Sequence, residues 1–217
     1  MSTDPKASAS PRTQAERAAT SDKALLAAAQ DLVLERGIDG TTLAAIGERA
    51  GYSRGLATYR YGSKAGLFRE VTANIHRRWV SYLEAAVGLQ SGVEALCCAA
   101  DAYYRFVADA PEDIRVLHIL YYAGAEPSSE MRGLAKTAFQ RQIADAQAWI
   151  EGGIVNGEIR PDISPIAEAT QYVSHIAGIT YIWLLNPVSI KFDEIQSSFK
   201  ASLRDRLATT PSSTKLR

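Results

Sequence analysis

Apolar residues in this chain recur every three or four positions over most of its length. Leu67, Val71 and Ile75, for example, follow one another at intervals of four. This spacing places side chains on one face of an α-helix. Nowhere do four to eight residues alternate between apolar and polar in the manner of a β-strand. The sequence therefore predicts an all-α protein.

Capping signals divide this pattern into nine expected helices. Thr13 and Glu16 have the spacing of a capping box, and Gly37 ends the same segment. Ser53 is expected to cap the third helix, and the Gly152-Gly153 pair to end the seventh. The nine helices are expected over about residues 13–36, 42–50, 54–61, 64–87, 93–107, 114–121, 129–151, 166–185 and 191–207.

Several classes of protein are excluded by what the sequence lacks. No uninterrupted apolar run approaches the ~18 residues of a membrane-spanning helix, and no signal peptide is visible at the start. The two cysteines, Cys97 and Cys98, are adjacent and make neither a disulfide framework nor a metal site. No phosphate-binding loop, nucleophile elbow or paired-carboxylate motif occurs. We therefore expect a cytoplasmic protein that is not an enzyme and holds no metal or cofactor.

The net charge of zero hides an uneven distribution along the chain. Residues 1–78 contain 12 Lys or Arg against 8 Asp or Glu, a net charge of +4, and the remainder carries −4. A basic first part is typical of a small nucleic-acid-binding module joined to another domain. Chance explains a difference of this size equally well, so the charge alone leaves both interpretations open.

The segment from residue 41 to residue 61 meets the geometric demands of a helix-turn-helix. Two helices that cross closely need a small residue midway along the first of them, and Gly47 stands there. The turn needs a left-handed residue, which Gly51 supplies. Ala57 and Tyr61 are expected to face inward on the next helix. Together these features favour a DNA-reading helix pair.

The outward face of the third helix is then the candidate DNA-binding surface. Arg54 is the candidate base reader, since a guanidinium can donate two hydrogen bonds to guanine. Leu56 is placed to touch a thymine methyl and Lys64 to touch a phosphate. An exposed, merely solvated face is the alternative interpretation of Arg54 and Arg60. The full set of DNA-binding candidates is Thr42, Ser53, Arg54, Gly55, Leu56, Thr58, Tyr59, Arg60 and Lys64.

The segment from Leu25 to Leu67 resembles the N-terminal domain of the TetR family of bacterial transcriptional regulators. The matching residues are Leu25, Ala28-Ala29, Leu32, Gly37, Thr41-Thr42-Leu43, Ile46, Ala50-Gly51-Tyr52-Ser53-Arg54-Gly55, Tyr61-Gly62-Ser63-Lys64 and Leu67. The resemblance implies an all-helical homodimer with an N-terminal DNA-binding domain and a C-terminal effector domain. It also implies a repressor that a small ligand releases from a double-stranded operator.

With this resemblance, the chain is expected to consist of four parts. They are a disordered arm over residues 1–12, a helix-turn-helix domain over 13–62, a helical domain for effector binding and dimerisation over 63–208, and a disordered tail over 209–217. One departure lies in the reading helix. The family commonly has Thr-Leu-Tyr-x-His-Phe where this chain reads Leu56-Ala57-Thr58-Tyr59-Arg60-Tyr61. We expect Tyr59 or Arg60 to replace the phosphate contact of the missing tyrosine.

Aromatic and polar side chains gather on the helices of the second domain. Apolar clefts with a few polar tips are typical of small-ligand sites, although such stripes more often form core. The candidates for binding an apolar or aromatic effector are His118, Tyr122, Trp149, Tyr172 and His175. A helical ligand-binding protein or an enzyme without DNA binding is the alternative, but neither requires Gly47, Gly51 and Ala57.

The helix expected before residue 185 is apolar on two sides. Both sides must be buried, and packing within one small domain buries only one of them. The second side is therefore a candidate dimer interface with the last helix, as the resemblance also implies. The interface candidates are Val173, Ala177, Thr180, Leu184, Ile195 and Phe199. Packing of this side on Phe139, Ile143 and Ile150 of the preceding helix is the alternative.

Overall fold

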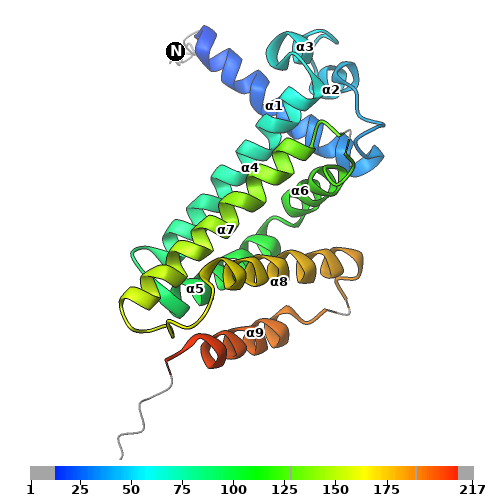
Figure 1. The fold of residues 1–217 in the computed structure, drawn as a ribbon. Coiled ribbons are helices and arrows are strands. Elements are labelled where there is room, and N and C mark those ends of the chain that lie inside the picture. The colour runs from blue at the N-terminus through cyan, green and yellow to red at the C-terminus, as the bar shows by residue number, and fades with distance from the viewer. Residues whose placement is uncertain (1–12, 128, 189, 210–217) are drawn as a thin grey trace, which may run out of the picture. The chain divides into compact units, whose positions relative to one another are not determined.

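The computed structural model describes residues 13–127, 129–188 and 190–209, and within them the chain forms nine α-helices and no strand (Figure 1). The predicted all-α class is confirmed. The expected arm over 1–12 and residues 210–217 of the expected tail lie outside the described residues. The helices are α1 (Gln14–Arg36), α2 (Leu43–Arg49), α3 (Leu56–Tyr61), α4 (Lys64–Val87), α5 (Gly92–Asp109), α6 (Pro111–Ala123), α7 (Arg132–Val155), α8 (Pro165–Leu185) and α9 (Phe192–Leu207).

The chain forms two compact units that divide within α4, between Val71 and Thr72. The first unit contains α1, α2, α3 and the start of α4. The second contains the rest of α4 and α5 to α9. Among the described residues, none of these helices is long and apolar enough to cross a membrane.

Local capping chemistry explains where most of these helices begin and end. The Thr13 side chain accepts from the Glu16 N–H, and the Glu16 carboxylate accepts from the Thr13 N–H. Gly37 ends α1 at φ +70°, which favours glycine. Pro111 and Pro165 stand in the first turns of α6 and α8, where a missing N–H costs no hydrogen bond.

Two expected boundaries were wrong. Ser53 does not cap α3 with its side chain. Its backbone carbonyl accepts from the Leu56 N–H at 3.1 Å, and Gly55 is the cap residue. Nor does the Gly152-Gly153 pair end α7, which continues to Val155. A Cβ on Gly153 would lie 2.6 Å from the Gly92 Cα atom, so this glycine permits a close helix contact. The glycine pair therefore marks a close contact between helices and not the end of α7.

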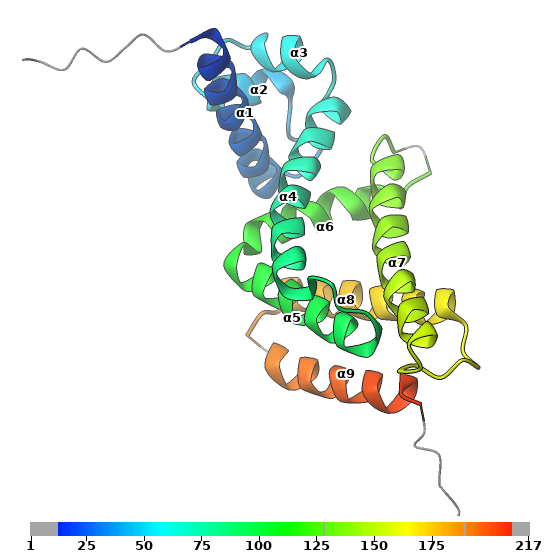
Figure 2. The ribbon, with the colours of Figure 1, turned by 90° about the vertical axis from the view of Figure 1, so that its left-hand side faces the viewer.

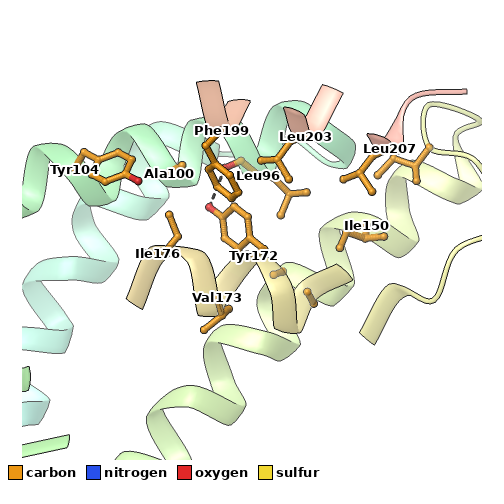
Figure 3. Close-up of a cluster of buried hydrophobic side chains, with 13 residues drawn as sticks. Leu96, Ala100, Tyr104, Ile150, Tyr172, Val173, Ile176, Phe199, Leu203 and Leu207 are labelled. Carbon is orange, nitrogen blue, oxygen red and sulfur yellow. Dashed lines mark hydrogen bonds between the residues drawn. The ribbon is translucent and has the colours of Figure 1, made fainter. Parts of the chain in front are cut away.

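A core cluster of the second unit joins α5, α7, α8 and α9 (Figure 3). Phe199, Leu203 and Leu207 of α9 point into it. At its centre the buried Tyr172 hydroxyl donates to the Leu96 backbone carbonyl at 2.9 Å. A buried tyrosine needs such a partner because an unpaired hydroxyl in an apolar core is costly. This bond therefore fixes α8 against α5 and positions the helices that enclose the cavity described below.

Candidate nucleic-acid interface and ligand cavity

The helix pair α2–α3 has the close contact that the sequence predicts. A Cβ on Gly47 would lie 2.5 Å from the Ser53 carbonyl oxygen, which is backbone and cannot rotate away. The turn passes through Gly51 at φ +77°, so the expected left-handed residue is confirmed. Ala57 is fully buried on the inner side of α3, also as expected.

Ion pairs hold the small helices of this unit together at its surface. Arg49 of α2 donates two hydrogen bonds of 2.7 Å to the Glu35 carboxylate of α1. Such bidentate pairs fix orientation as well as distance. The core beneath includes Leu25, Ile46 and Phe68, all with no exposed surface.

The outer side of the turn and of α3 is open to solvent. Seven of the DNA-binding candidates are exposed, namely Thr42, Ser53, Arg54, Gly55, Thr58, Tyr59 and Arg60. The Tyr59 side chain is the most open of the large apolar ones on this face, at 85%. Leu56 is half-buried, which leaves part of its side chain for an apolar contact. The Thr42 hydroxyl caps α2 by accepting from the Ala45 N–H at 3.2 Å.

Arg54, the candidate base reader, is ion-paired with Glu48 at the end of α2. Both side chains are exposed, so the pair is accessible to a competing ligand. A base or phosphate that binds this guanidinium must compete with the Glu48 carboxylate. Sequence reasoning missed Glu48, although its position six residues before Arg54 spans the tight turn.

Arg60 and Lys64 contact other parts of the same unit. The Arg60 guanidinium lies 3.2 Å from the Asp22 carboxylate of α1 and also donates to the Ser21 hydroxyl at 3.4 Å. Lys64 donates to the Ile38 carbonyl at 2.9 Å. Tyr59 and Arg60 were the two residues expected to replace the missing phosphate contact. Arg60 is held against α1 by these contacts, whereas the side chain of Tyr59 is open to solvent.

The second unit contains a cavity of about 90 Å³ among α4, α5, α6, α7 and α8, whose ribbons are seen in Figure 2. Its wall is largely aromatic and includes Trp79, Tyr103, Phe106, Tyr121 and Phe139. Polar groups reach it from His76, His118, Gln142 and Asp145. A mainly apolar wall with a few polar groups is typical of a small-molecule site.

The five predicted effector residues separate into three groups. His118, Trp149 and Tyr172 line this cavity. Tyr122 lines a second hollow next to it. His175 lies elsewhere, between α8 and α9, where its ring stacks on Phe199 with 3.7 Å between ring centres. The helical spacing predicted that His175 and Tyr172 face the same way. Three residues turn a helix by about 300°, so the two side chains differ in direction by about 60°, and this difference points His175 toward α9.

Burial disfavours the charged form of the two cavity histidines. It lowers the pKa of His76 and of His118, and the His118 Nδ1 atom lies 2.9 Å from the Ile114 carbonyl. The His76 Nε2 atom is buried with no hydrogen-bond partner within the described residues. Desolvation also raises the pKa of Asp145, which lies at the solvent-exposed edge. Within the described part of the chain, no group of three His, Cys, Asp or Glu residues could hold a metal ion.

Comparison with known proteins bears on the first unit. Residues 25–71 match the pattern of the family described as "Bacterial regulatory proteins, tetR family". The N-terminal domain belongs to the TetR family. A comparison with curated protein sequences finds no match.

Solved structures extend the TetR-type fold over most of the chain, each with a TM-score of 0.72. A putative TetR-family transcriptional regulator from Rhodococcus sp. is 20% identical, with 88% of this chain and all of that chain covered. SmeT, the repressor of the Stenotrophomonas maltophilia multidrug efflux pump SmeDEF, is 18% identical over 88% and 91%. FadR from Bacillus subtilis in complex with stearoyl-CoA is 14% identical over 83% and 96%. At these identities, the likeness shows the fold.

The residues expected at a TetR-type dimer interface are mostly buried within the second unit. Val173 and Thr180 are buried, and the Thr180 hydroxyl donates to the Ile176 carbonyl at 2.7 Å. Ala177 lines the cavity. This side of α8 packs on α7 through a cluster that includes Phe139, Ile143 and Ile150, which is the alternative given above. Leu184 and Ile195 are half-buried, and Phe199 belongs to the core.

A different side of α8 is open to solvent. Its exposed residues are Gln171, Ser174, Gly178, Ile182 and Leu185. The side chains of Ile182 and Leu185 are 51% and 69% exposed, which is high for large apolar residues. An open hollow of about 680 Å³ runs between this side and α9. Sequence reasoning missed this side because small and polar residues occupy most of it.

Proposed function

We propose that this TetR-family chain is a transcriptional repressor. It binds a palindromic DNA operator as a homodimer and leaves the operator when a small apolar or aromatic ligand binds. The observation that carries this proposal is the close α2–α3 pair with an exposed α3 face, in a chain whose second unit contains a separate aromatic cavity. SmeT has also been solved in complex with triclosan, a ligand of that protein, which supports a small-molecule effector here.

In the proposed complex α3 lies in the major groove. Arg54, just before α3, reads a guanine, while Thr58 and Tyr59 contact phosphates or base edges. Lys64 keeps its hydrogen bond to Ile38 and turns its remaining N–H donors to a phosphate. Arg60 makes no base contact in this proposal, and it positions α3 by pairing with Asp22 of α1.

The proposed homodimer uses the open side of α8. Ser174 and Gly178 carry little or no side chain, so a second α8 can approach closely there, and Ile182 and Leu185 add apolar area. The hollow beside them is lined by His175, Ile195 and other residues of α8 and α9, and the second copy would fill it. A two-fold interface of this kind demands two operator half-sites on one face of the DNA.

Binding to fluorescein-labelled fragments of the DNA flanking its own gene tests the function. The full chain is expected to prefer one palindromic fragment at moderate salt. Arg54→Ala should relax the preference at one base pair in each half-site, at a cost of ~1–3 kcal/mol. Equal binding of the wild type to all fragments, or none, would contradict a sequence-specific regulator.

The Glu48–Arg54 pair gives a second expected result. Glu48→Gln should raise operator affinity about two- to fivefold, because Arg54 no longer has to leave a carboxylate. Glu35→Gln is the charge-matched control, since Glu35 pairs with Arg49. Fluorescence anisotropy at constant salt measures both. If the two variants gain equally, net charge alone explains the gain and Glu48 has no particular effect on Arg54.

A further inference from the structure

The aromatic cavity has a neighbour with a different chemistry. A hollow of about 410 Å³ shares four lining residues with the cavity, His118, Tyr121, Phe139 and Ala177. Two basic side chains, Arg132 and Lys136 of α7, also line this hollow, whereas the described residues that line the cavity include neither arginine nor lysine. The shared residues show that the two spaces adjoin.

Helix α7 contributes residues to both spaces. Its lining residues are Arg132, Lys136, Phe139, Gln142, Asp145 and Trp149. Each of them is three or four residues from the next, but the steps accumulate, so Lys136 and Asp145 lie on opposite sides of α7. Along the length of the helix, the lining residues change from basic, through apolar and neutral polar, to acidic. Nine residues separate Lys136 from Asp145, a rise of about 14 Å along the helix.

The two basic side chains have no ion-pair partner within the described part of the chain. They stand four residues apart on a helix, where like charges repel. Glu130, an acidic residue close before α7, lines neither space. An anionic group bound between Arg132 and Lys136 would relieve this repulsion.

We propose that the effector is an organic acid with an apolar body. Its acidic group binds to Arg132 and Lys136, and its body passes Phe139 and His118 into the aromatic cavity. Asp145 sets the orientation, because its carboxylate repels an acid placed at the opposite end. Among the described residues, Arg132 and Lys136 are the arginine and lysine side chains that line the two spaces, and burial disfavours the charged form of the two histidines. This inference rests on the proposed function and names the chemical class of its ligand.

Three probes that differ only at one end test the inference, namely decanoic acid, 1-decanol and decylamine. Binding to the full chain is followed by tryptophan fluorescence, since Trp79 and Trp149 line the cavity. The acid is expected to bind about tenfold or more tightly than the alcohol. The double substitution Arg132→Gln with Lys136→Gln should remove this advantage and leave the alcohol unchanged. The double substitution Arg132→Glu with Lys136→Glu should make the amine bind more tightly than the acid.

The control replaces two exposed arginines of the same unit, Arg105→Gln with Arg115→Gln, which line neither space. It should keep the preference for the acid. Equal binding of acid and alcohol, or an equal loss in the control, would overturn the inference. So would tightest binding of the amine to the wild type.

Operator release is measured separately, on labelled DNA. If the acid binds through Arg132 and Lys136 but the operator stays bound, the acid site stands and the proposed release by ligand fails. If the chain binds its operator but the acid shows no advantage over the alcohol, the acid inference fails while the DNA-binding function stands.

Discussion

Gly47→Ala is expected to abolish specific DNA binding, although it adds a single methyl group. The new Cβ would meet the Ser53 carbonyl oxygen at 2.5 Å, and this oxygen belongs to the backbone of the turn. Relief requires α3 to move away from α2, and Arg54 moves with it. Overpacking of this kind costs ~1–3 kcal/mol, more than the ~1 kcal/mol that alanine gains over glycine in a helix. Urea unfolding and operator binding measure the two effects.

Gly133→Ala is the matched control for this substitution. Gly133 lies in α7, and a Cβ there meets nothing within 4 Å. The same change should therefore stabilise the protein by up to about 1 kcal/mol and leave operator affinity unchanged. Normal operator affinity of Gly47→Ala would show that the α2–α3 contact is looser than described and would remove the main geometric support for the reading face.

Gly178→Arg is expected to split the proposed dimer. Gly178 is exposed in the middle of the open side of α8 and has free space around its Cα atom in one copy of the chain. Two arginines brought together at a two-fold axis would repel each other and hold the helices apart. Light scattering should then report 23.5 kDa in place of twice that mass. Operator affinity should fall about 100-fold or more, because two linked half-site contacts become independent.

Ala108→Arg is the control, since it places an arginine on an exposed position of another helix, α5. It should remain a dimer. Phe199→Glu is a poorer test, because Phe199 packs on Tyr172 and His175 within one copy and its loss would damage the core. A wild-type mass of 23.5 kDa at micromolar concentration would contradict the dimer itself.

The sequence predicts the local features of this fold well, because periodicity and capping act over a few residues. Thr13, Gly37 and Gly51 all lie where their chemistry requires. The Gly152-Gly153 pair was misread because its partner, Gly92, is about 60 residues away in the chain. A glycine that ends a helix and one that lets two helices touch look the same in a sequence.

The candidate sites were harder to predict for a related reason. Apolar periodicity shows that Val173 and Thr180 are buried, but not whether this chain or a second copy buries them. His76 and Asp145 were missed because they lie on different helices and share no motif. The basic-to-acidic order along α7 can be recognised in the sequence only after the structure shows which of its side chains line the two spaces.

The shortness of α3 affects how operator recognition can change during evolution. A helix of six residues has almost no stability of its own, so its shape is set by the rest of the unit. The groups that set it are Ala57, the Gly47 contact and the Arg60–Asp22 pair, which join α3 to α2 and α1. Ser53, Thr58 and Tyr59 are thus free to be exchanged without loss of stability. A library randomised at these three positions should yield folded proteins with new operator preferences.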